Sequence, residues 1–422
     1  MKRLLCTIAL FGITLSSLFA ELYPSRRYVE MGYDIGVSVG QNAFGIKDVL
    51  VKDLVIDFSE LNERFQHSDF MVNLGLNPGF HFNVNVNGIG AGIKTDLDFH
   101  GNLSIDRALF RLLAEGNDLN ESETIGMSLN FESFISTSVP VRFKIGKLGI
   151  KVEPTYFVPL IYLPEPRAEI IYTTNEDGSL KAEAKANFDL YTAIDISPLL
   201  SETKGDLDYS KLTDSAKNGG IDLGAVVEYA LFDFLDVGGY ANIPIYPGKL
   251  DYHAYGTATA SFEMEEGFLN NLDYWTSTEE DRGEKPYKYT EPDWSGVQFD
   301  EEGYRVNRPL KLGVEAAWRP VGDWLVIHPK LGVTARNPFG KDFSIHSFSP
   351  EYSLSADMTF LYVLGFNVTT AYENQAFSHN VGLRLNTRVV ELDFNIGTSN
   401  SDFLRSFSLG GVQAQVGIKM GF

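Results

Sequence analysis

Hydrophobic and polar residues alternate along much of this chain with the period of two that is typical of extended strands. The alternation is clearest in the segments 28–40, 79–87, 91–100, 186–196 and 377–388. Their polar positions include full charges of both signs. A soluble sandwich turns the apolar side of such strands inward, whereas a membrane barrel turns it toward lipid and lines a wet lumen with the polar side.

The last eleven residues, 412–422, favour the barrel because they alternate strictly and finish on an aromatic residue, as closing strands of outer-membrane barrels do. The spacing of a polar residue, a glycine and two bulky apolar residues also resembles the recognition signal for the outer-membrane assembly machinery. These residues are Gln415, Gly417, Met420 and Phe422. We therefore expect the assembly machinery and outer-membrane lipids to be partners of this chain.

The last third of the chain divides most readily into strands. We predict them near 310–319, 324–336, 344–354, 357–371, 376–388, 389–398 and 408–422. Trp318 and Trp324 flank a short turn, and two interpretations stay open: an interfacial aromatic girdle or a pair of core tryptophans. If the C-terminus is periplasmic, this turn is periplasmic and the segment before residue 310 lies outside the cell.

Two segments interrupt the strand pattern. Residues 104–116 predict a helix that is capped by Ser104 and ended by Gly116. Residues 41–66 form a hatch-like N-terminal segment that includes a short helix near 57–65. Apolar residues repeat at helical spacing in the first of these, including Ile105, Leu109, Leu112 and Leu113. Both segments could act as a gating plug inside a wide barrel, or could cover one of its openings for stability.

The longest interruption, residues 263–309, is rich in Asp and Glu, with Tyr and Trp residues interspersed. The aromatic residues predict a folded loop. Calcium would suit so many carboxylate oxygens, but the spacing of an EF-hand is missing, and acidic loops are commonly just solvated. Whether this loop binds Ca²⁺ or a partner is left open.

The N-terminus and the composition fit export. Residues 1–20 read as a secretory signal peptide, and the single cysteine, Cys6, lies inside it. The net charge of −21 argues against nucleic acid as a partner, because phosphate binding depends on Lys and Arg. After residue 20 we find no apolar run long enough for a spanning helix. A membrane protein of this composition would have to be a closed barrel.

The sequence offers only weak matches to known catalytic motifs. Ser38 lies in a G-x-S-x-G pattern, which needs a strand, a sharp turn and a helix, but here it falls within strand-like alternation. Ser201 and Lys204 match S-x-x-K without its companion motifs. The seven histidines are scattered, and none pairs at metal-ligand spacing. We predict no enzyme activity, no cofactor and no metal site.

The layout resembles the large outer-membrane barrels of the FadL-like type, which transport long-chain fatty acids and other hydrophobic compounds. The resemblance rests on an N-terminal segment before the regular strands, an early helical insertion, the strand number and Phe422. That family carries an Asn-Pro-Ala triad where this chain has Asn42-Ala43-Phe44, so the same gating device is not implied. Gly116-Asn117 after a Leu-rich helix is similar to uncharacterised outer-membrane barrel families of this length.

We predict an all-β fold in which residues 21–422 form one transmembrane antiparallel up-and-down β-barrel in the outer membrane, with about 14 strands and a range of about 12–18. The resemblance implies passive transport of a hydrophobic or other small solute. The alternative is a surface adhesin or structural protein that acts through its loops, and an outer-membrane hydrolase is a distant third. Charged candidates for the lumen wall are Lys94, Asp96, Asp98, Arg384 and Arg388.

Overall fold

The computed structural model describes residues 27–43, 57–66, 69–164, 167–200, 210–264, 287–336, 338–339, 347–361, 363–373, 376–400, 403–407 and 411–422. The predicted signal peptide 1–20 lies outside these residues. So do residues 44–56 of the hatch-like segment and residues 265–286 of the long acidic loop.

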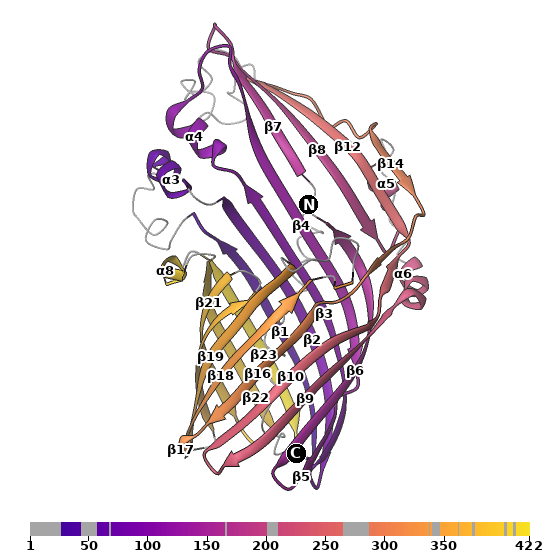
Figure 1. Cartoon of the computed structure of the whole chain (residues 1–422), viewed down its shortest axis with the longest axis vertical. Coiled ribbons are helices and arrows are strands. Elements are labelled where there is room, and N and C mark those ends of the chain that lie inside the picture. Colours follow the sequence, from indigo (N-terminus) through magenta and orange to yellow (C-terminus); the bar gives the residue numbers. More distant parts are fainter. Residues whose placement is uncertain are drawn as a thin grey trace, which may run out of the picture.

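The fold is a single antiparallel sheet that closes on itself (Figure 1). Around the lower part of the wall its strands are β1 (Val29–Gln41), β2 (Phe70–Val86), β3 (Ile89–Ile105), β4 (Ser122–Ser138) continued by β5 (Val141–Ile145), β6 (Leu148–Leu163), β9 (Gly220–Phe232), β10 (Leu235–Tyr246), β16 (Leu310–Trp318), β18 (Leu325–Ala335), β19 (Phe348–Phe360), β20 (Leu364–Glu373), β21 (Ala376–Asn386), β22 (Val390–Asn400) and β23 (Val412–Gly421). A four-residue strand, β17 (Pro320–Asp323), precedes β18.

The ring closes between its first and last strands. β23 pairs with β22 on one edge and with β1 on the other, so that Val39 lies opposite Val412 and Glu30 opposite Gly421. The backbone N–H of Tyr28 donates to the carbonyl oxygen of Phe422 at 2.6 Å. The predicted closing strand is therefore confirmed as the strand that joins the two ends of the sheet.

The wall forks at β4. The second half of β4 pairs with β6, and its first half pairs with β7 (Arg167–Thr174). Beyond β7 the sheet continues through β8 (Leu180–Thr192), β12 (Tyr252–Met264), β13 (Tyr287–Tyr289) and β14 (Val297–Asp300). Figure 1 shows β7, β8, β12 and β14 in the upper part of the molecule.

The fork corrects the expected number of strands. The ring has 18 strands in all, at the upper limit of the predicted range. The 14 strands named above for the lower wall equal the predicted central value, and the upper wall adds four. The difference arises because β7, β8, β12 and β14 widen only the upper wall. The all-β antiparallel fold is confirmed. The described helices are few and short, and none has the length and hydropathy needed to cross a membrane.

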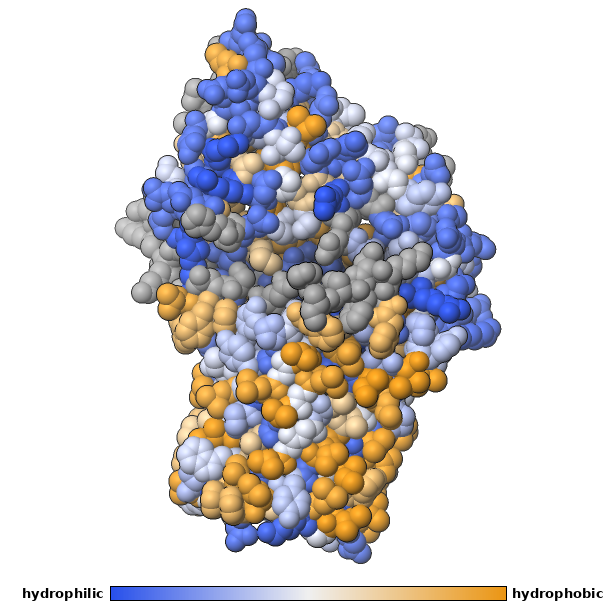
Figure 2. Space-filling view, viewed as in Figure 1, coloured by the Kyte–Doolittle hydropathy of each residue, from blue (hydrophilic) through white to orange (hydrophobic). Residues whose placement is uncertain are grey.

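The outer face of the lower wall is apolar, as Figure 2 shows by the band of hydrophobic residues over its lower half. The side chains of Val314, Leu331, Val381 and Ile396 are each more than half exposed. The polar positions beside them turn inward. This is the arrangement of a barrel in lipid. It excludes the soluble-sandwich interpretation for this part of the wall, because a sandwich would bury the apolar face.

Short turns join the strands at the lower rim, where the chain also ends (Figure 1). Asn87 and Gly88 have φ angles of 49° and 82°, which matches the mirror-image turn that suits the twist of a hairpin. Trp318 and Trp324 are 45% and 56% exposed. The core interpretation of this pair is therefore wrong, and their position at the rim fits an aromatic girdle.

The predicted helix is shorter than expected. α4 spans Ala108–Glu115, while Ser104 and Ile105 still belong to β3. Ser104 is therefore not the cap: a carboxylate oxygen of Asp106 accepts the N–H of Ala108 instead, at 2.8 Å. The predicted end at Gly116 is confirmed, with a φ of 79° that glycine adopts without strain.

α4 packs against a second helix, α3 (Phe58–Arg64), rather than standing alone. The rings of Phe65 and Phe110 stack with 4.7 Å between their centroids, and Leu61 and Phe70 complete the cluster. Figure 1 shows both helices beside the upper wall. Three shorter helices are α5 (Ser197–Leu200), α6 (Lys211–Ser215) and α8 (Phe403–Ser406).

One predicted strand boundary is wrong. The break expected between residues 354 and 357 does not exist, because β19 runs without interruption from Phe348 to Phe360. Its alternation continues through this stretch, with Ser355 and Asp357 lining the interior. The turn comes later, at Leu361, which has a φ of 50°.

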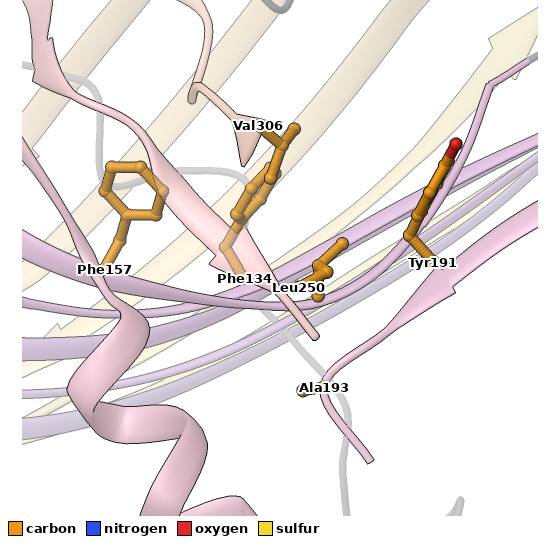
Figure 3. Packing of buried hydrophobic residues seen from close by; sticks show 6 residues of the cluster. All are labelled: Phe134, Phe157, Tyr191, Ala193, Leu250 and Val306. Carbon is orange, nitrogen blue, oxygen red and sulfur yellow. The ribbon is translucent and has the colours of Figure 1, made fainter. Parts of the chain in front are cut away.

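The main hydrophobic cluster (Figure 3) lies near the fork, where β6 pairs with both β4 and β8. Its members come from β4, β6 and β8, the segment after β8, and a separate two-stranded sheet of β11 (Gly248–Leu250) and β15 (Tyr304–Val306). The buried residues are Phe134, Phe157, Tyr191, Ala193, Leu250 and Val306. Phe134 and Phe157 meet edge to face with their centroids 5.7 Å apart. The cluster packs the interior where the upper and lower walls separate.

Candidate functional site: the barrel lumen

A cavity of about 1570 Å³ occupies the lower barrel. Inward positions of the lower wall supply much of its lining, because the alternation that turns apolar residues outward turns polar ones inward. Apolar residues such as Val326, Met358 and Phe366 contribute as well. Most of the inward side chains are polar. The charged ones are Arg27, Glu30, Asp34, Lys94, Arg142, Lys151, Glu153, Glu315, Asp323, Lys330, Asp357, Glu373, Arg384, Arg388, Glu391, Asp393 and Lys419.

Cross-strand pairing brings opposite charges together on the β21–β22–β23 wall. Arg384 lies opposite Asp393, and Glu391 lies opposite Lys419. Arg384 Nε is 2.8 Å from Asp393 and 3.5 Å from Glu391, while Lys419 Nζ is 3.1 Å from Glu391 and 3.4 Å from Asp393. Arg27 adds a third cation, 3.7 Å from Glu391. The five groups form one continuous network on this side of the lumen.

A second set of charge pairs lies on β3 and β6 of the lumen wall. Lys94 pairs with Asp96 at 2.7 Å, and Lys151 pairs with Glu153. The hydroxyl of Ser138 on β4 donates to the same Glu153 at 2.8 Å. The lining therefore holds many charges whose signs largely compensate one another, although the whole chain carries a net charge of −21.

Two arginine residues form ion pairs across the interior on the side of the fork, and we call the contacts of Arg308 with Asp98 and Asp222 the Arg308 brace. Arg308, which precedes β16, contacts Asp98 of β3 at 3.4 Å and Asp222 of β9 at 3.3 Å. Its guanidinium also lies 5.9 Å from the ring centre of Phe157. Arg336 at the end of β18 reaches Glu132 of β4 at 4.0 Å. Because these contacts join strands that are not neighbours in the sheet, they cross the interior and narrow it.

Some of the predicted lumen residues line the cavity and others do not. Lys94, Arg384 and Arg388 line the cavity. Asp96 binds Lys94, and Asp98 belongs to the Arg308 brace. The four apolar plug candidates, Ile105, Leu109, Leu112 and Leu113, lie at the end of β3 and on α4 and are not among the cavity-lining residues. A plug in the lumen is therefore not confirmed.

Several lumen residues were missed that the sequence pattern could have indicated. Glu391, Asp393 and Lys419 occupy the polar positions of two strands that alternate clearly. The sequence gave no such indication for Arg308, because it lies between two strands and its carboxylate partners are more than 80 residues away in the sequence. Ser38 lies in the middle of β1, opposite Gly75 and Gln413. The sharp turn that a G-x-S-x-G nucleophile requires is absent at this position.

Outside the lower wall, α4 is attached by a hydrogen-bonded trio. The hydroxyl of Tyr172 on β7 donates to a carboxylate oxygen of Glu123 at 2.6 Å, and Arg111 of α4 pairs with the same oxygen. The bond from Tyr172 and then the Arg111 guanidinium hold the pKa of Glu123 below its ordinary value of 4.5. Burial and the neighbouring carboxylate raise the pKa of Tyr172, which keeps its hydroxyl protonated as a donor.

Comparisons with known proteins return solved structures only. No protein-family model and no curated protein matches this chain. The Ralstonia pickettii toluene transporter TbuX is 8% identical with a TM-score of 0.43, covering 95% of this chain and 90% of that one. A mutant of the monoaromatic hydrocarbon channel TodX is 9% identical with a TM-score of 0.42, covering 95% and 91%. The NalP translocator domain from Neisseria meningitidis is 10% identical with a TM-score of 0.34, covering 100% and 94%.

These structures include hydrocarbon channels of the kind that the resemblance in the sequence indicated. Their TM-scores are below 0.5 and their identities are at or below one residue in ten. At that level the likeness carries no argument about what this chain binds or passes.

Proposed function

We propose that this protein is an outer-membrane channel through which a small solute diffuses. The observation that carries the proposal is a cavity of about 1570 Å³ inside a closed wall whose outer face is apolar. A water-filled lumen explains why so many ionised side chains lie inside the barrel, since burying them in a dry interior would be costly.

The lining favours a solute that carries polar groups. Paired charges of both signs can exchange hydrogen bonds with such a solute, whereas a hydrocarbon would have to displace water from them and gain little in return. The hydrophobic solute implied by the sequence resemblance is the second candidate.

The Arg308 brace should limit the rate of passage, because it crosses the interior between the cavity and the upper wall. In Arg308→Ala both carboxylates lose this cation and the side chain no longer spans the space between β3 and β9. Arg305→Ala is the matched control, since it removes an exposed arginine three residues away.

Liposome swelling with purified protein tests these points. We expect swelling with small sugars and amino acids, a several-fold faster rate for Arg308→Ala, and an unchanged rate for Arg305→Ala. Uptake of labelled toluene without any sugar-driven swelling would instead support the hydrophobic solute. If neither solute class enters, with the wild-type protein or with Arg308→Ala, the channel proposal is wrong.

Display of surface loops is a second candidate function, and one observation favours it. The upper wall of β7, β8, β12 and β14 extends well beyond the apolar band (Figure 2), although a channel needs no such extension. Replacing residues 265–286 by a short Gly-Ser linker separates the two functions. Lost adhesion of whole cells with unchanged liposome swelling would indicate display, and the reverse would favour the channel alone.

A further inference from the structure

Three strands of the upper wall bring one histidine and three carboxylates together. His253 of β12 lies directly opposite Asp300 of β14 on one side and Tyr191 of β8 on the other. Asp189 lies two residues before Tyr191 and so shares its face of the sheet. Glu302 follows two residues after Asp300. Nothing in the local sequence indicated this cluster, because its members are between 2 and 113 positions apart.

The ring of His253 is fixed in position. It is stacked between Tyr191 and Tyr255, with centroid distances of 4.4 and 4.6 Å, and its side chain is only 10% exposed. Its Nε2 is hydrogen-bonded to a carboxylate oxygen of Asp189. A carboxylate accepts but does not donate, so Nε2 carries the proton. In the neutral ring, Nδ1 is then left with a lone pair.

Among the residues that the structure describes, none forms a hydrogen bond with this lone pair. Nδ1 is buried, yet it lies 3.3 Å from Oδ1 of Asp300. The same Oδ1 accepts the backbone N–H of Glu302 at 2.9 Å. Two electron-rich atoms facing one another repel unless a positive charge lies between them. Two ligands of a tetrahedral Zn²⁺, each at about 2.0–2.2 Å from the metal, are separated by roughly 3.4 Å, which is close to the distance observed.

We propose that His253 Nδ1, Asp300 and Glu302 bind a divalent transition-metal ion of the Zn²⁺ class. Their ligand atoms lie within 4.8 Å of one another. Asp189 is a positioning residue: by accepting the hydrogen bond from Nε2–H it holds the tautomer and the ring orientation that metal binding needs, as carboxylates behind metal-bound histidines commonly do. Ca²⁺ fits less well because it prefers oxygen ligands throughout.

Such an ion would fasten the base of the acidic loop to the wall. Asp300 ends β14 and Glu302 lies on the way to β15, while His253 belongs to β12. Asp300 and Glu302 are accessible, so the ion can enter from solvent and keep a water ligand. The competing explanation is a doubly protonated His253 between Asp189 and Asp300, which would need no metal and would repel one.

The test uses the full-length protein without a histidine tag, purified in detergent and stripped with a chelator. We expect isothermal titration with Zn²⁺ to show one site that Ca²⁺ does not fill. His253→Gln should weaken Zn²⁺ binding at least 100-fold, and Asp189→Asn by about 10- to 100-fold. Glu301→Gln is the matched control, because it removes one negative charge between the proposed ligands and should leave binding unchanged.

Co²⁺ binding, followed by optical absorption, gives a second readout that is independent of calorimetry. A tetrahedral Co²⁺ absorption band in the wild type that is lost in His253→Gln would support the site, provided that the variant keeps the heat-modifiable gel migration of a closed barrel. Equal Zn²⁺ affinity in His253→Gln and wild type would overturn the proposal. So would failure of the wild type to bind Zn²⁺, or preferential binding of Ca²⁺.

Discussion

The lower and upper walls of this barrel are built from the same alternating strands but face different surroundings. In the lower wall the apolar side faces outward and the charged side lines the cavity. On the face of the upper wall seen in Figure 2 polar residues predominate, and buried apolar residues of the described chain gather in local clusters there and at the fork. The alternation of a strand therefore does not determine by itself which of its two faces is buried. That depends on whether lipid or water surrounds each face.

The two walls also differ in what stabilises them. The lower wall closes through an unbroken ring of strand pairs and needs no apolar core, because lipid takes that place. The upper wall has water around it and must bury apolar area within itself. Clusters such as that of Phe134 and Phe157 at the fork provide this burial. Truncating a buried apolar side chain should therefore lower the free energy of unfolding most at the fork and in the upper wall. Placing a charge on the outer face should lower it most in the lower wall.

The largest effect is expected for Phe157→Ala at the fork. Phe157 is fully buried, and removing such a ring leaves a cavity that costs about 3–5 kcal/mol. Phe394→Ala is the control, since Phe394 shares the outer face of β22 with Ile396 and is 43% exposed. We expect the free energy of unfolding, measured by denaturant titration in lipid vesicles, to fall much less for the control. Similar losses would contradict the division between the two walls.

The next largest effect is expected for a charge placed on the lipid face. Ile396→Arg on β22 introduces arginine into the apolar band, where the cost is about 2–4 kcal/mol near the bilayer midplane. Ile171→Arg makes the same change on β7 of the upper wall, at a side chain that is 37% exposed to water. The same unfolding titration should show little change there. A large loss at Ile171 would mean that lipid or a partner covers β7.

A smaller effect is expected in the lumen. Arg384→Gln removes one cation from the network around Glu391 and Asp393, where Lys419 still compensates part of the charge. Because Arg384 is 42% exposed on its side chain and the lumen is wet, the loss should be only about 1 kcal/mol. It should shrink further in concentrated salt. A loss several times larger would indicate a dry lumen and count against the channel.

The smallest effect concerns the attachment of α4 to the upper wall. The pKa of Glu123 is lower in the folded protein than its ordinary value of 4.5. The bonds from Tyr172 and Arg111 therefore contribute stability above that value and lose it as the pH falls through the lower folded pKa. The protection of α4 amides against hydrogen exchange, relative to the unfolded chain at the same pH, should fall below about pH 4.5 in the wild type. Glu123→Gln should exchange faster at neutral pH and show less of this dependence.

Much of the fold could be predicted because it depends on local alternation. The strands from β16 to β23 were expected within a few residues, except where β19 continues through Ser355 and Asp357. The fork could not be predicted, because no local sequence pattern indicates that the two halves of β4 pair with different strands, β6 and β7. The same holds for Arg308 and His253. Their importance comes from residues that are distant in the sequence and meet only when the sheet has formed.

The closure of the ring has a consequence for the time course of folding. β1 pairs with β23 from Glu30 opposite Gly421 to Val39 opposite Val412, so the contacts that complete the wall span nearly the whole chain. Contacts of such separation form slowly, since the entropy of a long loop must be lost first. Until β23 arrives, β1 presents an unpaired edge, which is the usual starting point for aggregation. Pairing with β23 is thus the step that ends this exposure.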